Sequence, residues 1–327
     1  METTITRYLE DAIAAEKSFE TQLQGFAKEA SLPEVRSMFE QHAQETRGQY
    51  EMLTSRLNAL GGSTSSVKSF LAHMFNMAPK AAQVGHVAQE RTTQDLIMAF
   101  SVENAEVAMY EALYVAAEVS GDQATAALAR KIQAQEQQTA DKVWSVIARS
   151  ATQAFAAVQG EKGEDSKAIL IRYLQDAEAA ERNFEDALAS FSKMGDQPDV
   201  QSLLSTMSRK ALTQHERLEA RLRALGATPS TMKSILAHVL AFTPVSAQMG
   251  HAESEKSTQH LIITYSAAAA EMGMYEALAA SAAAVGDRTT ESLARQLQSE
   301  EKEDHELAWQ QLPASARASY QPRASHA

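Results

Sequence analysis

The chain has 327 residues, a formal net charge of −12 at neutral pH and no cysteine. The acidic charge argues against a nucleic-acid partner, which would require clustered Lys and Arg. The lack of cysteine excludes disulfides, thiolate metal ligands and thiol nucleophiles. No segment reaches the roughly 18 uncharged apolar residues of a membrane span, and the N-terminus does not resemble a signal peptide. We therefore expect a cytoplasmic protein without a membrane partner.

The composition favours helices, because Ala, Glu, Gln, Leu and Met are frequent whereas Gly and Pro are scarce. In the first half of the chain, proline and glycine mark the ends of four long predicted helices. The first helix covers 3–29, the second ends at Leu60, and the third and fourth cover 92–119 and 123–156. The connection between the second and third helices is less regular, and short helices are predicted there around 67–76 and 80–90.

The second half of the chain repeats the first half without a gap. The segment that begins at Arg7 returns at Arg172, 165 positions later, and the same offset relates Trp144 to Trp309. The repeat is longer than the roughly 20–50 residues of a solenoid unit, so each copy should be a whole domain. We predict a first domain over 1–157, a linker over 158–166, a second domain over 167–312 and a disordered tail over 313–327. The helices of the second domain are predicted at 167–193, 199–225, 257–285 and 288–311.

The lengths of the connections predict how the helices of each copy pack. Short turns after the first and third helices imply two antiparallel pairs, and the long connection between the second and third helices lets the third cross over. This is the ferritin-like arrangement of a four-helix bundle. We therefore predict an all-α protein made of two tandem ferritin-like four-helix bundles.

Carboxylates interrupt the apolar faces of these helices. In the helix at 92–119, the positions that should face the bundle interior include Glu103 and Glu106, between Phe100 and Tyr110. Buried carboxylates are costly unless they are protonated, paired or bound to metal. Two of them about 4 Å apart repel by about 4 kcal/mol at an effective dielectric constant near 20. The other helices of the first copy bring Glu16, His42, Glu45, Gln49 and Glu136 to their inner sides.

A metal site is the simplest explanation of these residues. No Lys or Arg occupies the inward positions of the first copy, and hard carboxylate ligands suit iron or manganese. The alternative is that these glutamates lie on solvated faces, as most helical glutamates do. Four helices that each contribute an acid near the middle favour the metal site. Its candidate ligands are Glu16, His42, Glu45, Gln49, Glu103, Glu106 and Glu136.

Several segments of the first copy resemble the YciE/YciF-type ferritin-like proteins. They are AEKSFE, which ends at Glu20, the segment from His42 to Glu51, and the segment from Val102 to Tyr110. The resemblance covers nearly all of the first copy and, more weakly, the second. It implies a ferritin-like domain, a bacterial cytoplasmic stress-response setting and a di-iron centre. The ligands that it implies are Glu16, Glu45, Glu103, Glu106 and Glu136.

The first copy departs from the general di-iron pattern, in which a histidine follows a glutamate by three positions. Gly48 and Thr139 stand where the histidines are expected, three positions after Glu45 and Glu136. His42 and Gln49, each about one turn from Glu45, are candidate substitutes. We expect an all-carboxylate ligand set to bind metal less selectively, which affects oxygen activation more than metal binding.

The second copy has lost part of this set. At the five positions implied by the resemblance it has Glu181, Lys210, Ala268, Glu271 and Glu301. We expect the ammonium group of Lys210 to replace metal by pairing with one of the three glutamates. His305, one turn after Glu301, is either a new ligand or, as we favour, a polar residue of the altered pocket. We hypothesise that the second copy is a metal-free scaffold.

Other repeated residues are assigned to structure. Four histidines recur in both copies although the carboxylate set does not, so we expect them to serve packing or an interface. They are His73, His86, His238 and His251. Tyr110 and Tyr275 follow shared glutamates by one turn, which fits either a hydrogen bond to the carboxylate or plain packing.

Two functions of different classes are left open by the sequence. The leading hypothesis is a tandem ferritin-like metalloprotein with a di-iron or manganese centre in the first copy, which oxidises Fe(II) or consumes peroxide during stress. The alternative is a metal-free helical scaffold or binding module, and the sequence does not decide whether the chain is an enzyme. The repeat predicts a pseudo-dimer within one chain, and a homodimer of whole chains is a further expectation.

Overall fold

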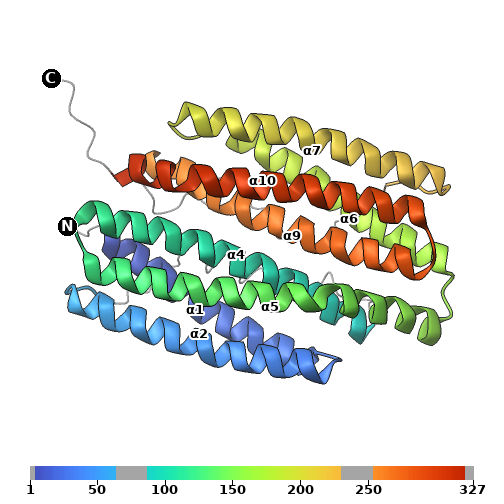
Figure 1. Cartoon of the computed structure of the whole chain (residues 1–327), viewed down its shortest axis with the longest axis horizontal. Coiled ribbons are helices and arrows are strands. Elements are labelled where there is room, and N and C mark those ends of the chain that lie inside the picture. The colour runs from blue at the N-terminus through green and yellow to red at the C-terminus, as the bar shows by residue number, and fades with distance from the viewer. Residues whose placement is uncertain (1–3, 64–86, 230–252, 321–327) are drawn as a thin grey trace.

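The computed structural model describes residues 4–63, 87–229 and 253–320, and within these ranges it contains helices and no strand (Figure 1). The first copy contributes α1 Thr4–Glu29, α2 Pro33–Ala59, α4 Ala88–Ser120 and α5 Gln123–Lys162. The second copy contributes α6 Ser166–Phe191, α7 Pro198–Ala224, the short 3-10 helix η2 Glu253–Glu255, α9 Lys256–Ala284 and α10 Arg288–Tyr320. The predicted all-α fold of two repeated helical bundles is confirmed.

Proline and glycine mark the helix ends, as the sequence predicts. Pro33 and Pro198 lie in the first turns of α2 and α7, where the missing N–H would have no intrahelical acceptor. Gly61 and Gly121 follow α2 and α4 with φ of 78° and 73°, a left-handed conformation that glycine adopts without steric cost. The short turns make antiparallel pairs of α1 with α2 and of α4 with α5.

The end of α2 and the start of α4 lie at opposite ends of the first bundle. Near the end of α2, the guanidinium of Arg56 donates to both carboxylate oxygens of Asp122, at 2.6 and 2.7 Å, in the turn between α4 and α5. The start of α4 lies at the opposite end, where the backbone N–H of Ser31 donates to Thr92 Oγ1 at 2.9 Å. The chain therefore crosses over between these helices, as expected of a ferritin-like bundle.

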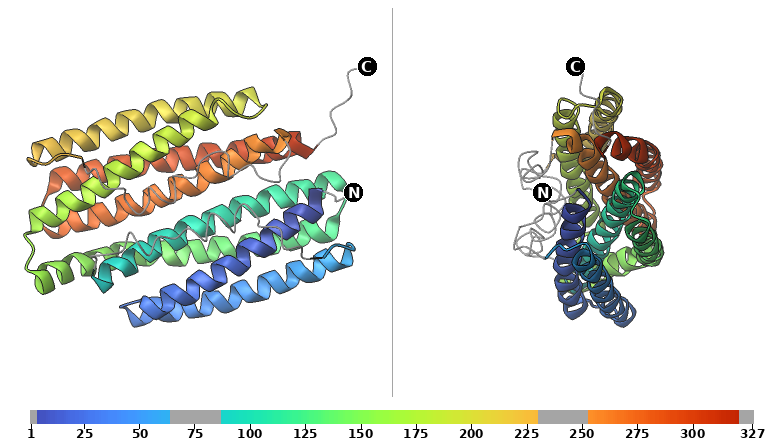
Figure 2. Two further views of the ribbon diagram at one scale, coloured as in Figure 1. Left: turned by 180° about the vertical axis from the view of Figure 1, so that it is seen from behind. Right: turned by 90° about the vertical axis from the view of Figure 1, so that its left-hand side faces the viewer.

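The two central helices, α4 and α9, are buried on all sides. Residues 99–113 of α4 and 257–271 of α9 are buried without interruption. Each helix packs against its own bundle on one side and against the central helix of the other bundle on the other (Figure 2). A helix that is buried all round is expected to be apolar all round, so a carboxylate anywhere on it requires a specific explanation.

The two bundles are related by an approximate two-fold axis. Arg7 of the first copy pairs with Glu255 of the second, and at the equivalent positions Arg172 of the second pairs with Glu90 of the first, at 2.8 Å. Each residue of these pairs lies 165 positions from its counterpart. Reciprocal contacts of this kind are the signature of an isologous interface. The two copies therefore form a pseudo-dimer within one chain.

A pair of equivalent serines lies at the centre of this interface. Ser101 Oγ donates to the carbonyl oxygen of Ser266 at 3.0 Å, and Ser266 Oγ donates to the carbonyl oxygen of Ser101 at 2.8 Å. Because each serine contacts its own counterpart, the pseudo-two-fold axis passes between them. The small side chains let α4 and α9 approach closely and satisfy both hydroxyl groups in the buried interface.

The predicted linker and tail were wrong in extent. Helix α5 continues to Lys162 and α6 begins at Ser166, so only three residues separate the two copies. Helix α10 continues through Pro313 to Tyr320. Proline inside a helix removes one backbone hydrogen bond, but Leu312 and Ala316 on either side of it are fully buried, and this packing keeps the segment helical.

Some predictions fall on residues that the structure does not describe. These include His73, His86, His238 and His251, most of the two short helices expected around 67–76 and 80–90, and the tail from 321. Among the helices that the structure does describe, none combines the length and the apolar character needed to cross a membrane.

Candidate metal centre

Four carboxylates and a histidine meet in the centre of the first bundle. Glu16 comes from α1, His42 from α2, Glu103 and Glu106 from α4, and Glu136 from α5. None of these five residues is more than 2% exposed. The surroundings are apolar, and the ring of Phe19 packs edge-on against the His42 imidazole with 5.4 Å between ring centroids. Such a cluster of ionisable groups in a water-excluded core is the strongest sign of a functional site in the first copy.

The first part of the cluster is formed by His42, Glu103 and Glu136. One ligand atom from each lies within 4.8 Å of the other two. His42 Nδ1 lies 3.1 Å from Glu103 Oε1, and His42 Nε2 lies 3.8 Å from Glu136 Oε2. An imidazole nitrogen and two carboxylate oxygens in this arrangement are suitable ligands for a transition-metal ion.

The second part is formed by Glu16, Glu106 and Glu136, whose ligand atoms also lie within 4.8 Å of one another. Glu136 therefore belongs to both groups of three. A carboxylate that is shared by two neighbouring ligand sets fits a dinuclear centre, because one residue would then help to hold both ions.

Two polar side chains orient these carboxylates. The Tyr110 hydroxyl donates to Glu16 Oε1, and the Gln49 side-chain amide donates to Glu136 Oε1. Tyr110 and Gln49 are both buried. Hydrogen bonds from such residues fix the direction in which ligating oxygens point. Of the two roles expected for Tyr110, the hydrogen bond to a carboxylate is therefore present.

The remaining carboxylate oxygens lack donors. Both oxygens of Glu103 and of Glu106 are buried without a hydrogen-bond partner, and no Lys or Arg of the described chain donates to the cluster. Burial raises the pKa of Glu16, Glu103 and Glu106 well above the usual range, and repulsion between the neighbouring carboxylates raises it further. The cluster therefore requires protons or cations, and hard divalent cations fit its donor set.

Glu45 is the one predicted ligand that the structure does not bring into the cluster. Its side chain is partly exposed and accepts a hydrogen bond from Gln41 Nε2 at 2.8 Å. The inward face of α2 is instead formed by His42, Thr46 and Gln49. Glu45 precedes Thr46 by one position and is rotated from it by about 100° around the helix axis. The position implied by the resemblance was therefore wrong on α2, and His42, a candidate substitute, occupies the site.

The second copy retains three of the four carboxylates. Ligand atoms of Glu181, Glu271 and Glu301 lie within 4.8 Å of one another, and all three side chains are buried. Tyr275 donates to Glu181 Oε2, and Gln214 Nε2 donates to Glu301 Oε1 at 2.6 Å, as Tyr110 and Gln49 do in the first copy. These contacts reproduce half of the first-copy centre.

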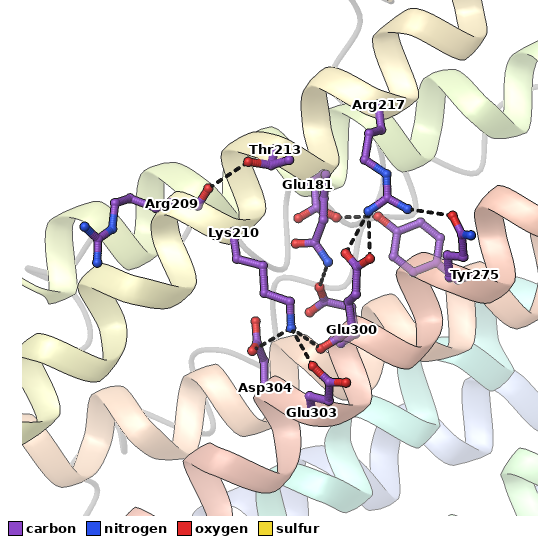
Figure 3. A network of polar contacts seen from close by, with 12 residues as sticks. Glu181, Arg209, Lys210, Thr213, Arg217, Tyr275, Glu300, Glu303 and Asp304 are labelled. Carbon is purple, nitrogen blue, oxygen red and sulfur yellow. Dashed lines mark hydrogen bonds and ion pairs between the residues drawn. The ribbon is translucent and has the colours of Figure 1, made fainter.

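Lys210 does not pair with these three glutamates. Its ammonium group donates to the carbonyl oxygen of Glu300 at 2.6 Å and to Asp304 Oδ1 at 2.9 Å, and it lies 3.6 Å from Glu303 (Figure 3). The expected pairing was wrong because Lys210, like Glu45, lies to the side of the inward face of its helix. From there the side chain reaches Asp304 and Glu303 on α10.

His305 is not a ligand in the second copy either. Its ring stacks on Tyr265 with 3.7 Å between ring centroids, and its Nε2 lies 3.0 Å from Asn104 Oδ1 of the first copy. Burial lowers the pKa of His305 to about 3. The residue therefore belongs to the interface between the bundles.

A third cluster, which was not predicted from the sequence, lies between α6 and α7. His215 Nε2 lies 2.9 Å from Glu178 Oε1 and 3.6 Å from Glu219 Oε1. The spacing of four residues between His215 and Glu219 on one helix was the available signal. Arg182 also pairs with Glu178, at 3.2 Å, so a local ion-pair network explains this cluster.

Comparison with known proteins identifies both repeats. The model of one family, described as "Domain of unknown function (DUF892)", matches residues 2–157 and again residues 165–319. No solved structure matches the chain.

Proposed function

The chain belongs to the DUF892 family, and we propose that it is a ferritin-like metalloprotein whose first bundle binds two iron or manganese ions. The observation that carries the proposal is the position of Glu136, which is shared by two groups of three buried ligands. His42, Glu103 and Glu136 would hold one ion, and Glu16, Glu106 and Glu136 the other. Four carboxylates balance the charge of two divalent cations, which removes the cost of burying them.

The surrounding residues would tune this centre. Tyr110 and Gln49 fix one oxygen each of Glu16 and Glu136, which leaves the other oxygens free to face the ions. A bound iron pair would supply the electrons for reduction of oxygen or peroxide. The apolar side chains around the cluster exclude bulk water, which strengthens the electrostatic attraction of the carboxylates for cations. We therefore place the oxidation of Fe(II), or the consumption of peroxide during stress, at this site.

The competing proposal is a helical scaffold that binds no metal. Protons rather than metal ions would then neutralise Glu16, Glu103 and Glu106, which the direction of their pKa shifts permits. The two proposals differ in one measurable quantity, the metal content of the folded protein at neutral pH.

Metal analysis of the purified full chain after loading with Fe(II) or Mn(II) tests the proposal. Glu103→Ala should remove the ion held with His42, and Glu136→Gln should remove about two ions because both ligand groups share Glu136. Glu111→Gln is the matched control, because Glu111 is also a buried glutamate of α4 but is satisfied by Arg130 and Gln133. An equal metal content in wild type and Glu136→Gln would overturn the dinuclear centre, and no retained metal in the wild type would leave the scaffold standing.

A further inference from the structure

The differences between the two copies fall on one half of the ligand set. His42 and Glu103 correspond to Met207 and Ala268 in the second copy. These are the two residues that belong only to the first ligand group, which they form with Glu136. The other group is complete in the second copy. Its members Glu16, Glu106 and Glu136 correspond to Glu181, Glu271 and Glu301.

The three glutamates of the second copy have oxygens available for a ligand. Their side chains are at most 1% exposed. Glu181 Oε1, both oxygens of Glu271 and Glu301 Oε2 are buried without a hydrogen-bond partner. The other oxygens of Glu181 and Glu301 accept from Tyr275 and Gln214, so the free ones are held in fixed directions. Unpartnered carboxylate oxygens that converge in a buried core require a cation or protons.

The nearby basic side chains are already used in ion pairs. Lys210 is bound to Asp304, Glu303 and the Glu300 carbonyl, and Arg217 donates to both carboxylate oxygens of Glu300 at 2.8 Å (Figure 3). These contacts lie along α10 outside the three-carboxylate cluster. The charge of Lys210 acts on Glu301 from a distance, without a hydrogen bond to it.

We propose that the second bundle binds a single divalent metal ion through Glu181, Glu271 and Glu301. The chain would then be asymmetric, with a dinuclear centre in one bundle and a mononuclear centre in the other. Met207 and Ala268 supply neither a nitrogen nor an oxygen ligand, so a second ion has no site there. The inference rests on the proposed function for the class of metal, hard or borderline divalent cations, but its ligands are separate.

The metal content of the full chain, loaded with Mn(II) and then desalted, tests this stoichiometry. Wild type should retain about three ions, and Glu271→Gln about two. Restoring the missing ligands with Met207→His and Ala268→Glu together should raise the content to about four ions. The reverse exchange in the first bundle, His42→Met with Glu103→Ala, should lower it to about two. Glu276→Gln, the second-copy equivalent of the Glu111 control, should change nothing.

The outcomes separate the two proposals. A wild-type content of about two ions that Glu271→Gln does not change would overturn the single-ion site and leave the dinuclear centre standing. A wild-type content of about one ion, abolished by Glu271→Gln but unchanged by Glu136→Gln, would support the single-ion site and overturn the dinuclear centre. No retained metal would overturn both. Helix content by circular dichroism verifies folding, and crystals of wild type soaked in Mn(II) supply a measurement without mutation. The expected anomalous peak lies between Glu181, Glu271 and Glu301, and its absence would overturn the inference.

Discussion

Lowering the pH should weaken the interface between the bundles through His305. The ring of this residue stacks on Tyr265, and its Nε2 lies 3.0 Å from Asn104 Oδ1 across the interface. Burial, together with the charge of Lys302, lowers the pKa of His305 from its ordinary value of 6.5 to about 3. The folded protein therefore keeps the ring neutral at pH values where the unfolded chain binds a proton.

The size of the effect follows from linkage between protonation and folding. A depressed histidine pKa leaves stability intact above the ordinary pKa of 6.5, and stability is lost as the pH falls from there towards about 3. Each pH unit in that window costs about 1.4 kcal/mol, so lowering the pH from 7 to 5 should cost about 2 kcal/mol through His305. This value does not depend on the exact folded pKa, provided that it lies well below 5.

Urea unfolding of wild type and His305→Gln, measured at pH 7 and pH 5 with a chelator present, isolates this contribution. The other titrating groups, including the buried carboxylates and His260, are the same in both proteins. The variant should be the less stable protein at pH 7, since it loses the stacking on Tyr265. Its deficit should shrink by about 2 kcal/mol at pH 5 because it has no imidazole to protonate. If the stability deficit of the variant stays constant or grows at pH 5, the conclusion that His305 is neutral in the folded protein is refuted.

Three further predictions concern the interface and the metal centre. Arg172→Ala should lower the free energy of unfolding by about 1–3 kcal/mol in urea titrations, because it removes the hydrogen-bonded ion pair between Arg172 and the buried Glu90 carboxylate. Glu106→Gln should raise the melting temperature of the chelated protein at pH 8, because the pKa of Glu106 is raised by burial and the stability that its neutral form provides is lost as the pH rises. In metal-loaded protein the same substitution should remove the part of the metal-dependent stabilisation that comes from the ion held with Glu16. Glu45→Ala should leave the metal content unchanged, in contrast to Glu103→Ala, because Glu45 lies outside the cluster.

The sequence predicted the architecture well because the repeat and the helix-ending residues are local signals. Pro33 and Gly61 mark helix boundaries through backbone chemistry that does not depend on packing. The ends of α5 and α10 were missed because tertiary contacts determine them. Phe155 and Val158 pack against Ile169 across the junction between the copies, and this keeps α5 helical beyond the predicted end.

The ligand set was predicted in part because periodicity resolves some helices better than others. On α2 the buried positions follow one face that includes His42 and Thr46, and Glu45, one residue before Thr46, is rotated off this face and partly exposed. On α4 the helical spacing predicted Glu103 and Glu106 at inward positions, although the structure buries all of residues 99–113. The signal that marked them as ligands was chemical, since ionised side chains inside an apolar segment are costly whichever way they point.

The interface between the bundles also carries an asymmetry that the repeat alone does not predict. Asn104 contacts His305 across the interface, whereas the pseudo-symmetric positions hold Ala269 and Ala140. Two first copies that met through this surface would place alanine opposite each Asn104 and leave its carbonyl oxygen without its donor. Leaving this buried oxygen without a hydrogen-bond donor costs about 1–3 kcal/mol. The polar pair therefore favours the pairing of a first copy with a second copy. The three-residue connection between α5 and α6 keeps the two copies of one chain adjacent, so this pairing should form within a chain rather than between chains.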